Sequence, residues 1–271
     1  MNVSPSYIKL HNSGELTKRI EKLYKILESC QLCPRKCKVN RLNGELGFCR
    51  SGKDLIISSF YQHFGEEKEL VGQYGSGAVF LTNCNLGCAY CQNYEVSHLG
   101  EGEKSSKEDL VRQMIHLKTL GCHNINFVTP THFIPQIVEA VDLAAKEGLD
   151  LPLVFNCGGY ENAEVIKMLE GIFDIYMPDI KYADAVNAKK YSNAEDYFQR
   201  LKESVKEMHR QVGDLEIKDG IAVKGLLIRH LVLPNDIAGS KKILEFIAKE
   251  ISKDSYVNIM DQYRPCYKAV N

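Results

Sequence analysis

The sequence predicts an α/β protein built as a partial (β/α)6 TIM-like barrel with a small cysteine-rich extension at its N-terminus. Three observations predict this fold class: short apolar runs alternate with helical segments from about residue 76 onward, most cysteines fall in two groups, and glycines at 72–77 separate the two parts. Strands that alternate with helices form parallel βαβ units with right-handed crossovers. We count six such strands, fewer than the eight of a closed barrel, and therefore expect an open one.

The composition is that of an ordinary globular protein. The chain has 271 residues, of which 44% are hydrophobic and 25% charged, which suits one large domain with a small appendage. A net charge of −1 gives no general attraction to nucleic acid or to acidic membranes, so we expect neither as a partner. Met1–Glu15 is polar, and no apolar run nears the roughly 18 residues that span a bilayer, so we expect a soluble, cytoplasmic protein.

The N-terminal extension is predicted to comprise residues 1–75. Apolar residues at helical spacing predict a short amphipathic helix over Leu16–Glu28. Turn-forming residues dominate Cys30–Gly52, which we expect to be a loop-rich knot, and Leu55–Phe64 suits a strand. The glycine-rich stretch Gly72–Gly77 marks the predicted boundary to a barrel domain of residues 76–271.

The barrel domain is predicted to alternate strands with helices. The six strands are expected at Ala78–Thr82, Asn124–Val128, Pro152–Phe155, Ile172–Tyr176, Val223–Leu231 and Tyr256–Met260. The first helix opens at Ser105-Ser106-Lys107-Glu108, read as a capping box, and the others are expected at Ile134–Lys146, Ala163–Leu169, Glu195–Arg210 and Lys241–Ile251. The chemistry of such barrels lies at the carboxyl ends of the strands, so the residues after each strand are the candidates for a site.

Three cysteines directly follow the first strand of the barrel, at positions Cys84, Cys88 and Cys91. A compact loop with this spacing lets each thiolate reach a different iron of a cubane cluster. A four-iron cluster with three protein ligands leaves one iron open to a small molecule. Gly87 lets the loop turn without a Cβ clash. The alternative is a zinc loop or three buried thiols.

The spacing Cys-x3-Cys-x2-Cys, with the aromatic Tyr90 before the third cysteine, resembles the signature of the radical S-adenosylmethionine (SAM) superfamily. The resemblance covers roughly Ser76–Asp261. It implies a [4Fe–4S] cluster on Cys84, Cys88 and Cys91, whose open iron binds SAM. It also implies reductive cleavage of SAM to methionine and a 5′-deoxyadenosyl radical, with a low-potential donor such as flavodoxin or ferredoxin.

Polar residues at later strand ends are the candidates for contacts to SAM. The segment Asp179-Ile180-Lys181 resembles the Asp-x-Lys segment of glycyl-radical-enzyme activating proteins, which implies contacts to SAM and to the incoming peptide. Lys181 can pair with the SAM carboxylate and Asp179 can orient it, whereas a surface ion pair is the alternative. Asn156 either bonds the methionine moiety or stabilises a turn, and His230 contacts SAM or substrate or is a satisfied, partly buried histidine.

The ends of the fifth and second strands extend this resemblance and also depart from it. Arg229 and Pro234 match an Arg-x4-Pro stretch that is similar to one in activating enzymes. The second strand ends in Thr129-Pro130-Thr131, where the superfamily usually has a Gly-Gly-Glu-type turn that binds the SAM amino group. His132, just after this turn, is a further candidate.

A second cysteine group, Cys30, Cys33, Cys37 and Cys49, lies within the N-terminal extension. Four thiolates suit an auxiliary iron–sulfur cluster and a zinc ion equally well. Either would tie down a segment that has little apolar core of its own. A cysteine segment before the signature resembles the pyruvate formate-lyase activating enzyme-like branch of the superfamily.

The sequence therefore predicts a radical SAM enzyme, with its substrate left open between two hypotheses. The first is an activating enzyme that takes a Cα hydrogen from a glycine of a large partner enzyme, because the open side of a partial barrel admits a peptide loop. The second keeps the radical chemistry but acts on a small molecule or another macromolecule. A non-catalytic iron–sulfur scaffold is the alternative from another class, and SAM cleavage separates it from the other two.

Overall fold

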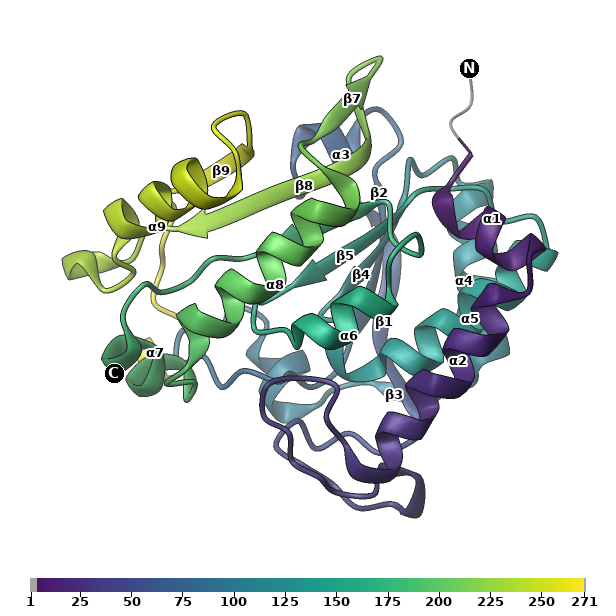
Figure 1. The fold of residues 1–271 in the computed structure, drawn as a ribbon, viewed down its shortest axis with the longest axis horizontal. Coiled ribbons are helices and arrows are strands. Elements are labelled where there is room, and N and C mark those ends of the chain that lie inside the picture. Colours follow the sequence, from purple (N-terminus) through teal and green to yellow (C-terminus); the bar gives the residue numbers. More distant parts are fainter. Residues whose placement is uncertain (1–3, 271) are drawn as a thin grey trace.

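The computed structural model describes residues 4–270, whose helices and strands follow the predicted order (Figure 1). The helices are α1 (Ser6–Asn12), α2 (Glu15–Ile26), α3 (Lys68–Val71), α4 (Lys107–Thr119), α5 (Ile134–Lys146), α6 (Ala163–Met168), α7 (Ala185–Ser192), α8 (Tyr197–Val212) and α9 (Ser240–Phe246). The strands are β1 (Leu55–His63), β2 (Ser76–Leu81), β3 (Glu103–Ser105), β4 (Ile125–Val128), β5 (Leu153–Cys157), β6 (Ile175–Pro178), β7 (Glu216–Lys218), β8 (Ile221–Leu231) and β9 (Tyr256–Met260).

These strands form one open sheet. Their order is β3-β1-β2-β4-β5-β6-β8-β7, and β9 pairs with the later part of β8. The six strands predicted for the barrel, β2, β4, β5, β6, β8 and β9, are parallel to their neighbours. In the described part of the chain β3 and β9 do not pair with each other, so the barrel stays open. The predicted fold class, a partial (β/α)6 barrel, is confirmed.

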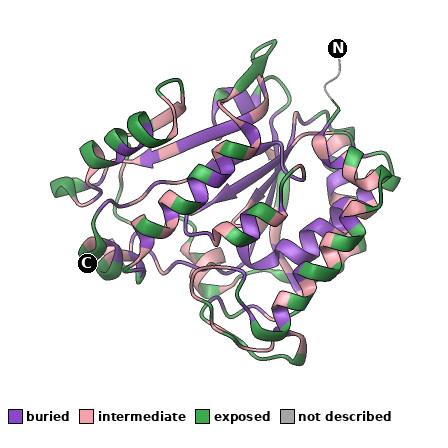
Figure 2. Cartoon of the chain, viewed as in Figure 1, coloured by how far each residue is buried: buried purple, intermediate pink, exposed green. Residues whose placement is uncertain are grey.

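Helices cover the outer face of this sheet (Figure 1). The helix α5 packs against α4 on one side and against α2 on the other. Because it lies between the sheet and the N-terminal helices, α5 is buried over most of its surface and is the most apolar of the long helices. Figure 2 shows the buried residues concentrated in the strands and on the helix faces turned toward them.

The inner face of the sheet is filled from the amino ends of the strands by the segment 64–75. Since β1 runs antiparallel to β2, the chain leaves β1 at the amino end of β2 and turns back through α3. Leu70 packs there in a small cluster with Val154 of β5, Ile175 of β6 and Leu227 of β8. The opposite, carboxyl end of the barrel is therefore the end available to a ligand.

Several elements differ in detail from the prediction. The capping box of α4 uses Ser106 and Asp109, one residue later than predicted, because Ser106 takes the extended conformation that an N-cap needs. Five short elements were not predicted: α1, α3, α7, β3 and β7. Each is too short to show a periodic pattern.

The N-terminal segment is joined to the barrel along a strand pair. Strand β1 pairs with β2 from Ile57↔Leu81 to His63↔Ser76, across the predicted boundary at residue 75. The division into residues 1–75 and 76–271 stays a prediction. No helix in residues 4–270 is both long and apolar enough to span a membrane.

Candidate active site

The inner cysteine loop lies at the carboxyl end of β2 and is defined by Cys84, Cys88 and Cys91. Each sulfur has a hydrogen-bonding partner. The Leu86 N–H donates to Cys84 Sγ over 3.3 Å, and the Ser192 hydroxyl donates to Cys88 Sγ over 3.0 Å. Cys91 Sγ lies 3.1 Å from Ser97 Oγ. Such bonds stabilise thiolates and tune the potential of a cluster that they hold.

The end of α7 fixes the backbone of this loop. The N–H of Gly87 donates to the carbonyl of Ser192 over 3.2 Å, and the N–H of Ala89 donates to the carbonyl of Tyr191 over 2.7 Å. Asp184 caps α7 by accepting from the Asn187 N–H over 2.9 Å, which starts the helix close to the site. Residues about 100 positions apart in the sequence thus build one loop support.

Burial of the inner cysteine loop disfavours free thiolates. It raises the pKa of the Cys84 thiol and of the Cys88 thiol, so thiolates form there only beside a strong positive charge. Within residues 4–270 no three Cys, His, Asp or Glu side chains converge closely enough to hold a single metal ion. A cubane needs no such convergence, because it spreads its thiolates over separate irons. The donor set therefore fits an iron–sulfur cluster.

A polar layer crosses the barrel interior at its carboxyl end, and it consists of Glu66, Asn156, Asp179, Lys181 and Arg229. Arg229 connects its members: Nε donates to Asp179 Oδ1 over 2.7 Å, Nη1 to Glu66 Oε2 over 2.9 Å, and Nη2 to Asn156 Oδ1 over 2.8 Å. Lys181 Nζ donates to Asp179 Oδ2 over 2.8 Å. The structure thus brings three of the predicted SAM contacts, Asn156, Asp179 and Lys181, into one network.

The charged side chains of the polar layer shift one another's pKa values. Burial raises the pKa of Asp179, but Arg229 and Lys181 outweigh it and lower that pKa to about 2. Burial lowers the pKa of Lys181, and Asp179 outweighs it, so the net shift is upward. Burial also raises the pKa of Glu66, against the opposing effect of Arg229. Asp179 and Lys181 are therefore both ionised at neutral pH.

The polar layer reaches the inner cysteine loop through Lys181. Burial raises the pKa of the Cys88 thiol, and the Lys181 ammonium acts in the opposite direction on it. Lys181 is therefore a basic side chain that is bonded to the layer and whose charge acts on a cysteine of the inner loop. Its backbone is held by the Tyr197 hydroxyl, which accepts from the Lys181 N–H over 3.0 Å and donates to the Asp179 carbonyl over 2.8 Å.

Glu66 is the member of the polar layer that sequence reasoning missed. It lies in the segment 64–75, before the barrel begins, and reaches the interior from the amino ends of the strands. Its Oε1 accepts from Asn126 Nδ2 and from Asn156 Nδ2, each over 3.3 Å. The pair Glu66-Glu67 after a predicted strand is the only sequence signal, and a pair of acidic residues is normally a solvated turn.

Two predicted residues lie apart from the polar layer. Tyr90 is buried against Tyr182 and Tyr263, with both ring centroids 6.3 Å away, so it packs beside the inner cysteine loop. His230 lies on the opposite face of β8 from Arg229, because neighbouring residues of a strand alternate. Its Nδ1–H donates to the Ile180 carbonyl over 2.7 Å, and Nε2 lies 2.8 Å from Ser240 Oγ. Both ring nitrogens of His230 therefore have partners within the protein, which fits the alternative of a satisfied histidine, and a contact to SAM or substrate stays a prediction.

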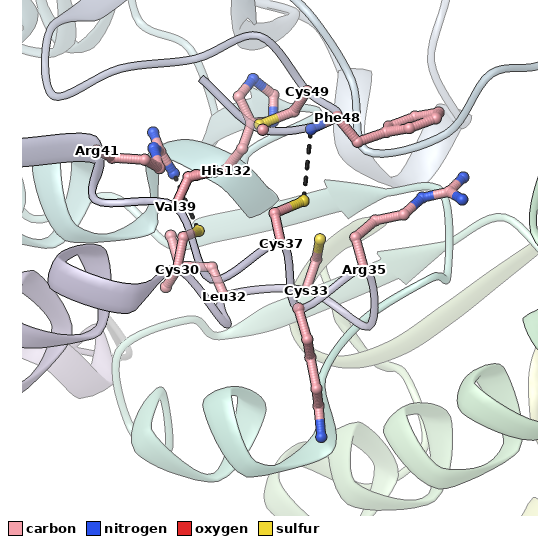
Figure 3. Close-up of a pocket in the computed structure, with 12 residues that line it drawn as sticks. Cys30, Leu32, Cys33, Arg35, Cys37, Val39, Arg41, Phe48, Cys49 and His132 are labelled. Carbon is pink, nitrogen blue, oxygen red and sulfur yellow. Dashed lines mark hydrogen bonds between the residues drawn. The ribbon is translucent and has the colours of Figure 1, made fainter. Parts of the chain in front are cut away.

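The outer cysteine pocket is formed by the N-terminal cysteine group and is lined by Cys30, Cys33, Cys37 and Cys49 (Figure 3). The loop closes on itself, since the N–H of Cys30 donates to the Val39 carbonyl over 2.9 Å. The N–H of Phe48 donates to Cys37 Sγ over 3.4 Å. The four predicted ligands therefore share one pocket.

Arg35 joins the outer cysteine pocket to the inner cysteine loop. Its Nε donates to the Asn85 carbonyl, inside the inner loop, over 3.0 Å, and Nη1 donates to the Asn193 carbonyl. The guanidinium lies 3.8 Å from the centroid of Phe48 and 5.2 Å from that of Tyr160. A single side chain between Cys33 and Cys37 thus holds the backbone between Cys84 and Cys88.

The turn after β4 contacts the outer cysteine pocket and the end of β2, from which the inner cysteine loop starts. His132 lines the outer cysteine pocket, and its Nε2–H donates to the Thr82 carbonyl at the end of β2 over 2.6 Å. Thr131 donates to Glu161 Oε1 over 2.8 Å. Burial raises the pKa of Glu161 to about 8, against the bonds from Thr131 and Cys157. His132 is thereby placed with the outer pocket and not with the polar layer.

Comparisons with known proteins agree with this geometry. Residues 79–224 match the model of the radical SAM superfamily. Two proteins of Methanocaldococcus jannaschii align with most of the chain. The uncharacterized protein MJ0674 is 30% identical over 260 residues, which are 93% of this chain and 70% of the relative. The uncharacterized protein MJ0808 is 24% identical over 259 residues, which are 88% and 71%.

Two solved structures are also similar. HydG, a maturase of the [FeFe]-hydrogenase, has a TM-score of 0.48 and 14% identity over 72% of this chain and 45% of its own. The tagged protein anSMEcpe with bound AdoMet has a TM-score of 0.47 and 11% identity over 69% and 51%. The chain thus spans about half the length of each solved structure. On the family match, which covers more than half of its residues, the chain belongs to the radical SAM superfamily, whose members cleave SAM with a [4Fe–4S] cluster.

Proposed function

We propose that this radical SAM enzyme generates a glycyl radical on a partner enzyme. The inner cysteine loop holds the [4Fe–4S] cluster in this proposal, and the polar layer holds SAM. The observation that carries the proposal is the ion pair of Lys181 with Asp179 at the end of the barrel where the inner cysteine loop lies, from where the Lys181 charge acts on the Cys88 thiol. It joins the cluster ligands to a charged layer at the open end of the barrel.

Each part of the polar layer has a role toward a zwitterionic ligand. When bound, the cluster supplies the electron that splits the sulfonium of SAM into methionine and a 5′-deoxyadenosyl radical. Lys181 is the side chain for the SAM carboxylate. Asp179 keeps Lys181 charged and in place, and Arg229 holds Asp179 from the other side. Glu66 is the candidate partner for the amino group of SAM. The Gly-Gly-Glu-type turn that usually binds this group is absent from the end of β4.

A macromolecular hydrogen donor is supported by the surroundings of the site. Large apolar side chains are exposed on three segments that border the inner cysteine loop: Leu46 at 58%, Leu99 at 59% and Val186 at 72%. A contiguous apolar surface beside a functional site is typical of protein contact surfaces, and these side chains are our candidates for one. The sheet is open between β3 and β9. The segment after β9 packs against the inner cysteine loop through Tyr263 and Tyr90, and against the turn after that loop through Tyr267 and Tyr94. The Asp179-x-Lys181 segment resembles that of activating proteins.

The proposal also includes two further components. A low-potential one-electron donor of the flavodoxin or ferredoxin class would reduce the cluster. The outer cysteine pocket would hold a second metal centre, either an auxiliary iron–sulfur cluster or zinc.

The first experiment is anaerobic reconstitution with iron and sulfide, reduction with dithionite, and measurement of 5′-deoxyadenosine formed from SAM. We expect cleavage that Cys84→Ala, Cys88→Ala or Cys91→Ala each abolishes. Cys122→Ala is the matched control, because Cys122 is a buried cysteine outside both groups. No cleavage from a fully loaded, reduced wild-type protein would favour a scaffold.

The second experiment tests the hydrogen donor. Peptides from glycyl-radical enzymes, deuterated at the glycine Cα, are added to the cleavage reaction. We expect deuterium in 5′-deoxyadenosine and a glycyl-radical doublet in the electron paramagnetic resonance spectrum. Cleavage without deuterium transfer from any such peptide would point to a small molecule or another macromolecule as the substrate.

A further inference from the structure

The outer cysteine pocket contains a buried arginine next to its thiols. Arg41 is 1% exposed, and its Nη1 points at Cys30 Sγ over 3.9 Å (Figure 3). Nε and Nη2 both donate to the carbonyl of Gly52, over 3.2 and 2.7 Å. Among residues 4–270 no hydrogen bond or ion pair joins Arg41 to a carboxylate.

A guanidinium in this position needs an anion. Arginine stays protonated in proteins, and a buried charge without a counter-charge is strongly unfavourable. Arg229, the buried arginine of the polar layer, meets the same demand with two carboxylates, Glu66 and Asp179. Arg41 has only a neutral carbonyl and sulfur. The four cysteines that share the pocket with Arg41 are the groups that could supply a counter-charge, as the ligands of a metal centre.

Four thiolates in one pocket require a metal centre, and the geometry favours a cluster over zinc. Zinc lies about 2.3 Å from each of four thiolates, which brings their sulfur atoms within about 4 Å of one another. In residues 4–270 no group of three metal-binding side chains is placed to hold a single metal ion. A cubane accepts wider spacing, because each thiolate binds its own iron. The N–H bond from Phe48 to Cys37 Sγ is also of the kind that surrounds cluster thiolates.

We propose that Cys30, Cys33, Cys37 and Cys49 hold a fully ligated [4Fe–4S] cluster and that Arg41 is its buried counter-cation. Four thiolates around a cubane leave a net negative centre, which the guanidinium neutralises where no carboxylate does. The inference rests on the proposed function only in assigning the inner cysteine loop to the other cluster. Arg41 is a positioning residue for the centre and touches no substrate.

The test uses full-length protein in which Cys84, Cys88 and Cys91 are all alanine, so that any remaining cluster belongs to the outer pocket. After anaerobic purification and reconstitution, iron, acid-labile sulfide and zinc are measured. We expect about four irons and four sulfides per chain. Because this protein cannot cleave SAM, the result does not depend on whether the proposed function is right.

Arg41→Met in the same background tests the counter-cation. We expect the cluster to be lost to a chelator about tenfold faster, and its midpoint potential to be more negative, because the reduced cluster carries more negative charge. Arg41→Lys should restore part of both. Lys38→Gln is the matched control, since it removes one positive charge from an exposed position of the same loop.

Three results would overturn the inference. One is a stoichiometric zinc ion without sulfide, and another is a protein that binds neither metal. The third is an Arg41→Met cluster with the stability and potential of the Lys38→Gln control. If Arg41→Met does not fold by circular dichroism, the same two readouts in Arg41→Lys decide: values unchanged from the parent background contradict the role of Arg41.

Discussion

The inner cysteine loop and the outer cysteine pocket contain the same ligand type in opposite electrostatic settings. The inner loop has three thiols, and its nearby cations, Lys181 and Arg229, are paired with Asp179 and Glu66. The outer pocket has four thiols and a buried cation, Arg41, for which the described residues supply no carboxylate. The inner charges are thus balanced within the protein and remain available to a zwitterionic ligand. The positive charge of Arg41 in the outer pocket would be balanced only by the proposed metal centre.

The largest expected effect is a difference in SAM cleavage between a variant of the inner cysteine loop and a variant of the outer cysteine pocket. Cys88→Ala should abolish 5′-deoxyadenosine formation while the fold is retained, because the cluster loses a ligand next to the SAM site. Cys37→Ala, the outer counterpart, should keep SAM cleavage within about tenfold of wild type, as expected for a remote support. Both are measured in the anaerobic cleavage assay, with circular dichroism as the check on folding. Equal loss in the two variants would remove the distinction between the groups.

The charge balance of the polar layer can be broken at Arg229. Arg229→Met leaves the carboxylates of Glu66 and Asp179 without their partner, and breaking such a buried pair costs about 3–5 kcal/mol. Urea unfolding of the metal-free protein measures this free energy. Arg112→Met on the surface of α4 should change it by less than about 0.5 kcal/mol. A loss at Arg229 as small as this would mean that the layer is not held together by its charges.

Glu161, which accepts a hydrogen bond from Thr131 beside the outer cysteine pocket, should make the stability of the protein depend on pH. Burial raises its folded-state pKa from 4.5 to about 8, so the folded protein binds a proton that the unfolded chain releases. Its contribution to stability is complete below about pH 4.5 and is lost as the pH rises toward 8. In this window the loss is about 1.4 kcal/mol per pH unit.

Glu161→Gln removes this pH dependence. Between about pH 5.5 and 7.5 the variant should gain about 2–3 kcal/mol relative to wild type, as measured by urea unfolding of the metal-free protein. Glu164→Gln, at an exposed position on α6, is the control. Parallel stability curves for wild type and Glu161→Gln would show that Glu161 is ionised in the fold.

The smallest expected effect is on the KM for SAM when Lys181 is replaced. Lys181→Ala should raise the KM for SAM about tenfold, equal to about 1.4 kcal/mol, because the SAM carboxylate loses its partner. Lys189→Ala, an exposed lysine on α7, should leave it unchanged. If KM for SAM and binding of the peptide are both unaffected, Lys181 does not belong to the ligand site.

The strands of the barrel could be predicted from the sequence because each is an apolar run that is followed by polar or turn-forming residues. Every predicted strand of the barrel formed, and the inner cysteine loop lies at the strand end where it was expected. Asn156, Asp179 and Lys181 could be named because they lie at or directly after strand ends. The same reasoning could not choose between Arg229 and His230, because only the alternation along β8 turns Arg229 toward the polar layer and His230 away from it.

Glu66 and Arg41 show what a sequence pattern does not contain. Glu66 contacts Arg229 across 163 positions, and its role depends on the path of the segment 64–75 into the barrel. Arg41 is one of many basic residues in its region, and only its burial distinguishes it. Charge partners over long sequence separations have no local signal, so only the structure reveals them.

The segment 64–75 also has a consequence for how the protein is made. Its bonds to the last two strands span most of the chain: Glu66 to Arg229, Glu69 to Tyr256 over 187 positions and Glu67 to Asn258 over 191. Chains grow from the N-terminus, so the inner cysteine loop leaves the ribosome long before these partners do. The bonds between segment 64–75 and strands β8 and β9 therefore form late. A growing chain carries the thiols of the inner cysteine loop before these bonds can form.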